Sequence, residues 1–105
     1  AADSQRRQQK GIYSSAVFGP AGKRVQVILL DGRYFRSKMK TGGPTVVPPY
    51  GVIRNPYVAT TDADATFLGD EQWKWLEAQL REPAELRLVC SGVQVVADEH
   101  QFEKW

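Results

Sequence analysis

The chain has 105 residues, 42% of them hydrophobic and 25% charged, which is usual for one small globular domain and too short for two. A net charge of +2 carries no nucleic-acid signature, and no apolar run approaches the roughly 18–20 residues of a membrane span. The single cysteine, Cys90, excludes an internal disulfide framework.

The first segments of the chain predict a polar arm, a strand and a turn. Residues 1–10 are polar and basic, which is typical of a frayed arm or the end of a helix. The pair Arg6-Arg7 is followed by the polar stretch QQKG, so no signal peptide is recognised. Residues 11–19 are strand-forming, and residues 19–22, with sequence GPAG, predict a turn.

Residues 25–31 form the most apolar run of the chain and predict a strand. Alternate positions are apolar on both faces, with Val25, Val27 and Leu29 on one and Ile28 and Leu30 on the other. This pattern is typical of an inner strand that is covered on both sides. The run ends in Asp31-Gly32-Arg33, which places a carboxylate, a glycine and a cation at the strand end.

Residues 37–66 predict a long loop. The prolines at positions 44, 48, 49 and 56 exclude regular structure across most of it. Because loops of this length are uncommon in compact domains and are often functional, the loop is a candidate lining of a substrate pocket. Its contacts would then be Tyr50, Arg54 and Tyr57; surface packing without a ligand is the alternative.

The clearest predicted element is a helix that begins near Asp70 and is ended by Pro83. Its acidic start suits the positive end of the helix dipole, and Glu77 and Arg81 are spaced for an ion pair. Trp73, Leu76 and Leu80 share one phase and are expected in the core, whereas Trp75 is expected to pack on the long loop.

A second strand is predicted at residues 85–96, with Leu86, Leu88 and Cys90 on a buried face and a bend near Gly92. Cys90 is therefore expected to be a core thiol. The alternative is a nucleophile, but the sequence has no histidine at a spacing that would indicate one. Strand, crossover with helix, and strand make a β–α–β unit, so the two strands are expected to be parallel. Ligands would gather at their carboxyl ends, near Asp31.

The order of these motifs resembles the alkaline phosphatase D (PhoD-like) family. The resemblance is carried by VQVILLDGRYFRS, FLGDEQWKWLEAQL, LRLVCSGVQVV and HQFEKW, and it covers the chain from about Arg6 to Trp105. The family usually has Thr or Ser where this chain has Gly32. The family's metal-ligand motifs, an upstream Cys and GD, DDHD, and a downstream GDxH, do not occur in this sequence.

The resemblance implies an α/β fold in which the β-(long loop)-α-β unit is part of a calcineurin-like α-β-β-α sandwich. It further implies a metal-dependent hydrolase of phosphomonoesters or phosphodiesters, of a family that is often exported. The implied cofactors are divalent or ferric metal ions, namely calcium, iron, zinc or manganese, and the implied partner is a phosphate-ester substrate. We expect the chain to be a single partial domain that binds no metal and is inactive alone.

The candidate catalytic residues are Asp31, Arg33 and His100, none assigned firmly, and no metal ligand is assigned. Arg33, Arg36, Tyr50 and Arg54 are candidates for substrate binding because guanidinium groups suit phosphate. For Asp31 and Arg33 the alternative is an ion pair that holds the loop to the strand end. For His100, within Asp98-Glu99-His100, it is a solvated turn.

Two classes of function remain open. The first is a segment of a phosphoesterase, and the second is a small non-catalytic α/β binding or interaction module. One helix covers only one face of a small sheet, so the apolar second face of residues 25–31 needs another cover. Self-association through that face is the expected substitute, without a nucleic-acid or membrane partner.

Overall fold

The computed structural model describes residues 5–96 and Trp105, and this part of the chain is a mixed α/β protein. The α/β class predicted from the sequence is confirmed. The chain divides into two compact units: the first contains the residues up to Arg36 and Thr66–Gly92, and the second contains Ser37–Ala65 and the residues from Val93 onward. Neither described helix is long and apolar enough to cross a membrane.

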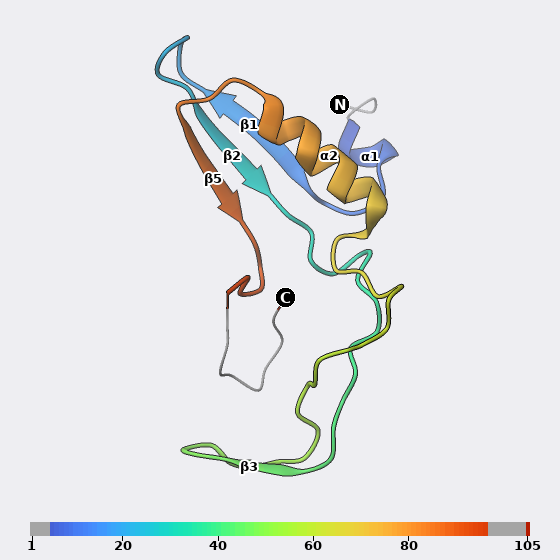
Figure 1. Ribbon diagram of the computed structural model, residues 1–105. Coiled ribbons are helices and arrows are strands. Elements are labelled where there is room, and N and C mark those ends of the chain that lie inside the picture. The colour runs from blue at the N-terminus through green and yellow to red at the C-terminus, as the bar shows by residue number, and fades with distance from the viewer. Residues whose placement is uncertain (1–4, 97–104) are drawn as a thin grey trace. The chain divides into compact units, whose positions relative to one another are not determined.

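The first unit is built on a three-stranded sheet with the order β1-β2-β5 (Figure 1). Strand β1 (Ser14–Phe18) pairs antiparallel with β2 (Val25–Leu29), and β2 pairs parallel with β5 (Leu86–Cys90). One further hydrogen bond, from Leu30 N–H to Cys90 O at 2.9 Å, continues the parallel pairing past the strand ends. The carboxyl ends of β2 and β5 therefore lie together at one edge of the sheet.

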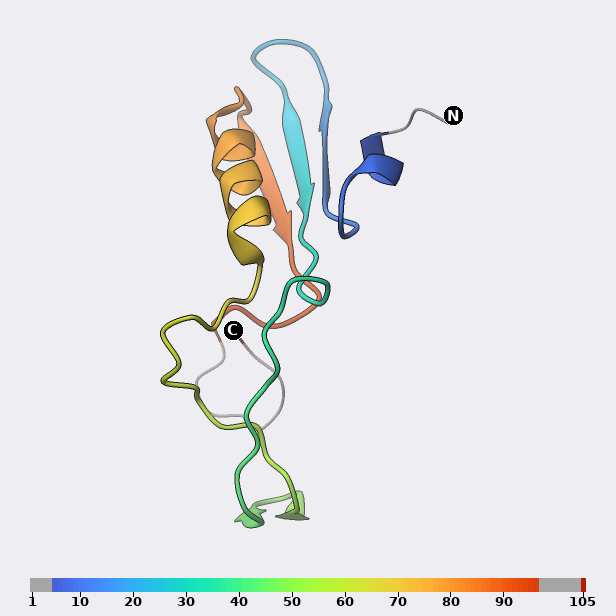
Figure 2. The same ribbon diagram turned by 90° about the vertical axis from the view of Figure 1, so that its right-hand side faces the viewer.

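Helix α2 (Gly69–Arg81) lies over one face of this sheet (Figure 2). Its first turn carries Asp70 and Glu71, which favours helix formation at the positive end of the dipole. An ion pair of 2.5 Å joins Glu77 to Arg81. The predicted helix and its surface pair are therefore confirmed.

The buried side of α2 differs from the predicted one. Gly69, Gln72 and Leu76 are buried, whereas Trp73 and Leu80 are each 46% exposed. The prediction that Trp73 and Leu80 lie in the core was wrong. The buried side of the helix includes a polar residue, Gln72, and a search for apolar residues alone does not find that side.

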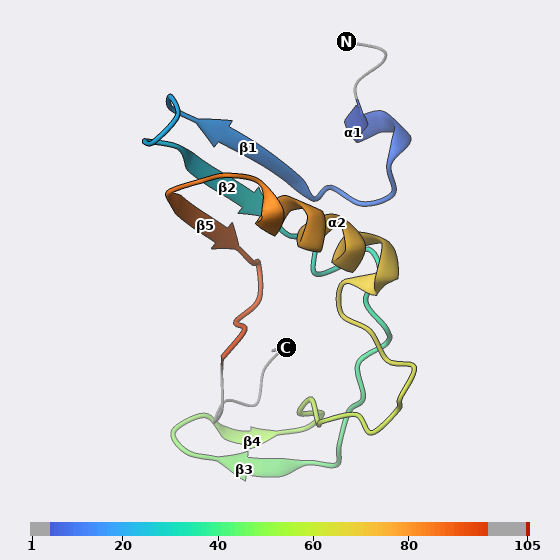
Figure 3. The ribbon, with the colours of Figure 1, turned by 45° about the horizontal axis from the view of Figure 1, so that its top comes forward.

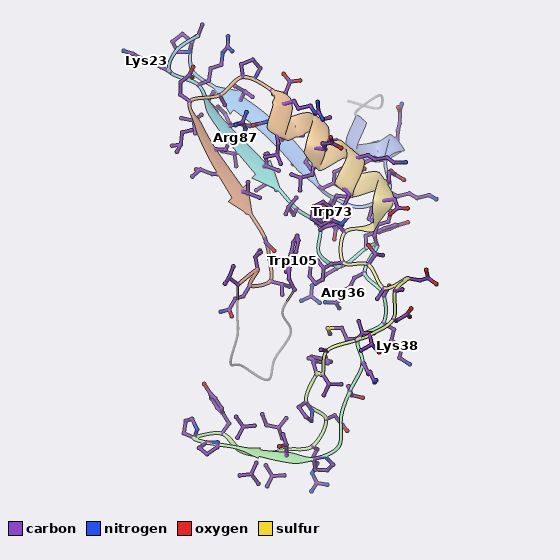
Figure 4. The ribbon with its side chains drawn as sticks, viewed as in Figure 1. Lys23, Arg36, Lys38, Trp73, Arg87 and Trp105 are labelled. Atoms are coloured by element: carbon purple, nitrogen blue, oxygen red, sulfur yellow. The ribbon has the colours of Figure 1, made fainter. Side chains whose placement is uncertain are left out.

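The face of β2 toward α2 contains a buried glutamine as well as Ile28. Gln26 is fully buried, and its Nε2 donates to Gln79 O at 3.0 Å and to Ser15 Oγ at 3.2 Å. Its Oε1 accepts at 2.7 Å from Nε of Arg87, a residue of β5 that is labelled in Figure 4. This network satisfies the buried amide and joins helix to sheet, so this face is not purely apolar.

The opposite face of the sheet, called the open face below, is apolar and exposed. Its exposed side chains are Phe18, Leu29, Leu86, Leu88 and Cys90. The prediction that Cys90 is a packed core thiol was wrong, because α2 covers only the other face. The second strand is also shorter than predicted, since β5 ends at Cys90.

The N-terminal part of the first unit leads into β1 through a short helix, α1 (Gln5–Gln8). The side chain of Gln9 then donates to Tyr13 O at 2.7 Å. Tyr13 is buried, and its ring lies 4.6 Å from that of Trp75. Trp75 thus packs on the start of β1, through a contact between elements that are about 60 residues apart.

The second unit contains a β-hairpin that the sequence did not predict. Strands β3 (Thr45–Val47) and β4 (Gly51–Ile53) pair antiparallel (Figure 3). The backbone also pairs beyond the hairpin, with Val58 N–H donating to Lys40 O at 3.0 Å. The prolines at positions 48 and 49 lie in the connecting turn, where no ladder hydrogen bond is lost.

Candidate functional site

The candidate site is the turn that follows β2, residues 31–36, called the strand-end turn below. It lies at the carboxyl end of a parallel strand pair, which is where open α/β sheets place their ligands. The start of α2 lies next to it, because Gly32 contacts Phe67 and Phe35 contacts Gly69. The turn is therefore held between the sheet and the helix.

Asp31 caps this turn with its carboxylate. Oδ1 accepts the N–H groups of Arg33 at 2.9 Å and of Tyr34 at 3.0 Å. Oδ2 accepts the N–H of Ile12 at 2.9 Å, from the segment that leads into β1. Asp31 is only 7% exposed. Both oxygens are thus engaged by the backbone, and one side chain ties two distant segments together.

The same contacts keep the Asp31 carboxyl ionised. Burial by itself would raise the pKa of this carboxyl. The three backbone hydrogen bonds and the positive charge of Arg33 outweigh burial and hold the pKa of Asp31 below its ordinary value. A carboxylate in this state suits a cap and not a general acid.

The side-chain amide of Gln72, in α2, forms two hydrogen bonds with the backbone of Asp31. Its Oε1 accepts the N–H of Asp31 at 2.8 Å, and its Nε2 donates to Asp31 O at 2.9 Å. Nε2 also donates to Leu68 O at 3.2 Å. The amide is fully buried and uses both N–H groups and its oxygen. Gln72 therefore continues the backbone pairing of β2 with a side chain.

Two glycines allow the strand-end turn and α2 to approach closely. A Cβ on Gly32 would lie 2.7 Å from Phe67 Cε1, so the Phe67 ring occupies the space of a side chain there. A Cβ on Gly69 would lie 2.8 Å from Phe35 Cβ, and Gly69 has a φ of 73°. The lack of a side chain at Gly32 thus permits the contact with Phe67.

Of the predicted substrate-binding residues, Arg33 and Arg36 belong to this turn. Arg33 is exposed, whereas Arg36 is partly buried, with its Nη1 atom shielded from solvent. Asp31 meets Arg33 through the backbone N–H, and the guanidinium charge acts on the carboxyl through space. The turn therefore places an exposed, positively charged residue just after the carboxyl end of β2.

The remaining candidate residues lie elsewhere. Tyr50 is exposed in the hairpin turn, where its N–H donates to Val47 O at 2.7 Å, and Arg54 follows β4. Both belong to the second unit. His100 lies outside the described residues, as do Asp98 and Glu99.

Sequence reasoning missed Gln72 and Phe67 as parts of this site. A signal for Gln72 existed, because it lies four residues before the buried Leu76 and three after Gly69, on the same side of the helix. A polar residue in the buried phase indicates a hydrogen-bonding role. Phe67 carried no such signal, since its contact with Gly32 depends on the tertiary fold.

The described residues do not fit a metal centre. Among residues 5–96 and Trp105, no group of three or more His, Cys, Asp or Glu side chains could hold an ion. The best placed carboxylate, that of Asp31, already accepts three backbone hydrogen bonds. Three of the roughly four acceptor sites of this carboxylate are therefore already used by the backbone, which leaves it little capacity to bind an ion.

Comparison with known proteins identifies the family of the chain. The PhoD-like phosphatase family matches residues 2–104, which is nearly the whole chain. No curated protein and no solved structure matches the chain. Members of the matching family are generally metal-dependent and act on phosphate esters. With a match of this extent, the chain belongs to the PhoD-like phosphatase family.

Proposed function

We propose that this chain is the central segment of a metal-dependent phosphoesterase, and that Arg33 contacts the phosphate of a phosphomonoester or phosphodiester. The observation that carries the proposal is the exposed Arg33 on a turn fixed by Asp31, at the carboxyl ends of β2 and β5. A guanidinium presents a planar pair of donors that matches two phosphate oxygens.

The chain alone is expected to be inactive. Hydrolysis of a phosphate ester in a metal-dependent enzyme needs an ion that activates water and neutralises phosphoryl oxygens. The described residues offer no cage for such an ion. The segment would therefore supply a phosphate contact and a scaffold, while metal ligands come from other parts of a complete enzyme.

The test of this proposal is an assay of the 105-residue chain with an aryl phosphate monoester and an aryl phosphate diester, each with added calcium, manganese, zinc or ferric ions. We expect negligible turnover with every ion. Metal-dependent turnover that copurifies with the chain would contradict the inactivity. If Arg33→Ala removed that turnover and Arg81→Ala did not, the site would be right and the inactivity wrong.

The open face supports an inference about the fold of the complete enzyme. We infer that a second sheet covers it there, as in a calcineurin-like α-β-β-α sandwich. This is supported by the one-sided cover of α2 and by the exposed apolar residues Phe18, Leu29, Leu86 and Leu88. Without that sheet the chain is expected to self-associate, which sedimentation measures. A monomer at all concentrations with low binding of a hydrophobic dye would contradict this inference.

The open face also favours the second candidate, a non-catalytic interaction module. Phosphate binding separates the two functions. If inorganic phosphate does not perturb the NMR signals of Arg33, the phosphoesterase role of the strand-end turn fails. The interaction module is then the better description of the chain.

A further inference from the structure

We propose that Gln72 is a positioning residue for Arg33: its buried amide holds the backbone of Asp31, and Asp31 in turn fixes the direction of the strand-end turn that presents Arg33. This inference rests on the proposed phosphate contact of Arg33. Gln72 itself touches no substrate, since it is fully buried and its amide bonds the backbone of Asp31 and Leu68.

The first step is the chemistry of the buried position. Gln72 lies between Gly69 and Leu76 on the buried side of α2, where an apolar side chain would pack without polar atoms to satisfy. The amide is nevertheless accommodated, because its oxygen and nitrogen bond to the N–H and C=O of Asp31 at 2.8 and 2.9 Å. Such two-point pairing fixes both position and rotation of one peptide segment, which packing alone does not.

The second step leads from Asp31 to Arg33. With its backbone held by Gln72, Asp31 directs Oδ1 at the N–H groups of Arg33 and Tyr34. These two bonds close the turn at the residue that carries the candidate guanidinium. The third bond, from Ile12 N–H to Oδ2, holds the carboxylate from the opposite side. A shift of the Asp31 backbone would therefore move Arg33 together with the turn.

The third step is a pair of variants that distinguishes the positioning role of Gln72 from a role in filling space only. Gln72→Met keeps the length of the unbranched side chain and removes the amide. Gln79→Met is the matched control on the same helix, because Gln79 takes part in the core through its backbone oxygen. Inorganic phosphate is the probe, and the NMR signals of the Arg33 backbone and side-chain N–H groups report its binding.

We expect Gln72→Met to weaken phosphate binding at Arg33 by about tenfold, the loss that corresponds to one or two positioning hydrogen bonds. Gln79→Met should bind phosphate as the wild type does. Far-UV circular dichroism checks that both variants keep the helix.

Gln72→Glu adds a pH readout that packing does not affect. A protonated carboxyl donates and accepts as the amide does, so it can hold both backbone groups of Asp31. The ionised form only accepts, and its charge faces the carbonyl oxygens of Asp31 and Leu68. Burial raises the pKa of the introduced carboxyl above the usual value of about 4.3, whereas Asp31 stays ionised at lower pH.

Two other charged groups matter here: Arg33, which acts on Asp31 through space, and Glu71, which precedes Gln72 in α2 and accepts a hydrogen bond from Tyr13 at 3.2 Å. As pH falls through the pKa of the introduced carboxyl, phosphate affinity of Gln72→Glu should rise toward that of the wild type. The ratio to wild type at each pH removes the titration of phosphate itself. The ratio for Gln72→Met should stay flat.

Three results decide the matter. Wild-type affinity in Gln72→Met, with unchanged Arg33 signals, would overturn the positioning role alone. If Gln72→Met fails to fold, the pH series of Gln72→Glu decides instead, and a flat ratio overturns the role. If the wild type itself shows no response of Arg33 to phosphate, the proposed phosphate contact fails, and the positioning role fails with it.

Discussion

Replacement of Gly32 by alanine tests the contact between the strand-end turn and the start of α2. The new Cβ would lie 2.7 Å from Phe67 Cε1 and 3.1 Å from Cζ. Carbon atoms pack at about 3.5–4.0 Å, so the ring must retreat by roughly 0.8 Å or more. Gly32 has no positive φ, so the cost is steric and does not come from backbone strain.

The expected loss of stability follows from two opposing terms. Overpacking of this kind costs about 1–3 kcal/mol. The loss of glycine's freedom in the unfolded chain offsets about 0.4–1 kcal/mol. Gly32→Ala should therefore lower the free energy of unfolding by about 1–2 kcal/mol, which is a fall of several degrees in melting temperature for a domain of this size.

Urea unfolding followed by tryptophan fluorescence measures this change. Gly92→Ala is the control, because a Cβ there meets nothing within 4 Å and Gly92 has no positive φ. Phe67→Leu should relieve the clash, so Gly32→Ala should cost less in that background. Equal stability of Gly32→Ala and wild type would refute the proposed packing of Phe67 on Gly32.

Three further predictions concern single side chains. Because the pKa of Asp31 is lowered on folding, its contribution to stability is present above about pH 4 and is lost as pH falls through the folded pKa. Asp31→Asn should be less stable than the wild type at neutral pH by about 1–3 kcal/mol. In urea titrations from pH 7 to pH 2, the variant should also lose less stability on acidification than the wild type does. Tyr13→Phe removes the hydrogen bond to Glu71 and keeps the ring contact, so thermal unfolding should show a loss of about 1 kcal/mol, and an unchanged melting temperature would count against that bond. Cys90 should react with a thiol reagent in the dilute native chain at nearly the rate of the unfolded chain, and protection that persists on dilution would show that the open face is covered within one molecule.

Local sequence patterns were sufficient to predict the regular elements of the first unit. The acidic start, the Glu77–Arg81 spacing and the following proline predicted α2, and a run of residues that is apolar on both faces predicted β2. These signals act between neighbours in the chain. The buried side of α2 was predicted wrongly, because it depends on which residues contact the sheet. The polar Gln72 is buried there, whereas Trp73 is exposed.

The candidate site could be located from the sequence, but its construction could not be predicted. An Asp at a strand end that bonds the N–H groups two and three residues later is a local turn pattern, so the cap on Arg33 and Tyr34 was accessible in principle. The bond from Ile12, 19 residues earlier, and the grip of Gln72, 41 residues later, depend on the tertiary fold. No local pattern reports contacts at such separations.

The close contacts of Gly32 with Phe67 and of Phe35 with Gly69 have a consequence for the length of the segment between them. They hold together the two parts of the first unit between which Ser37–Ala65 is inserted. The length of such an insertion has little effect on the stability of the first unit. Shortening its 29 residues to about eight would reduce the entropic cost of loop closure by only about 1 kcal/mol. We therefore expect residues 37–65 to tolerate shortening or replacement without disturbance of the framework that carries Arg33.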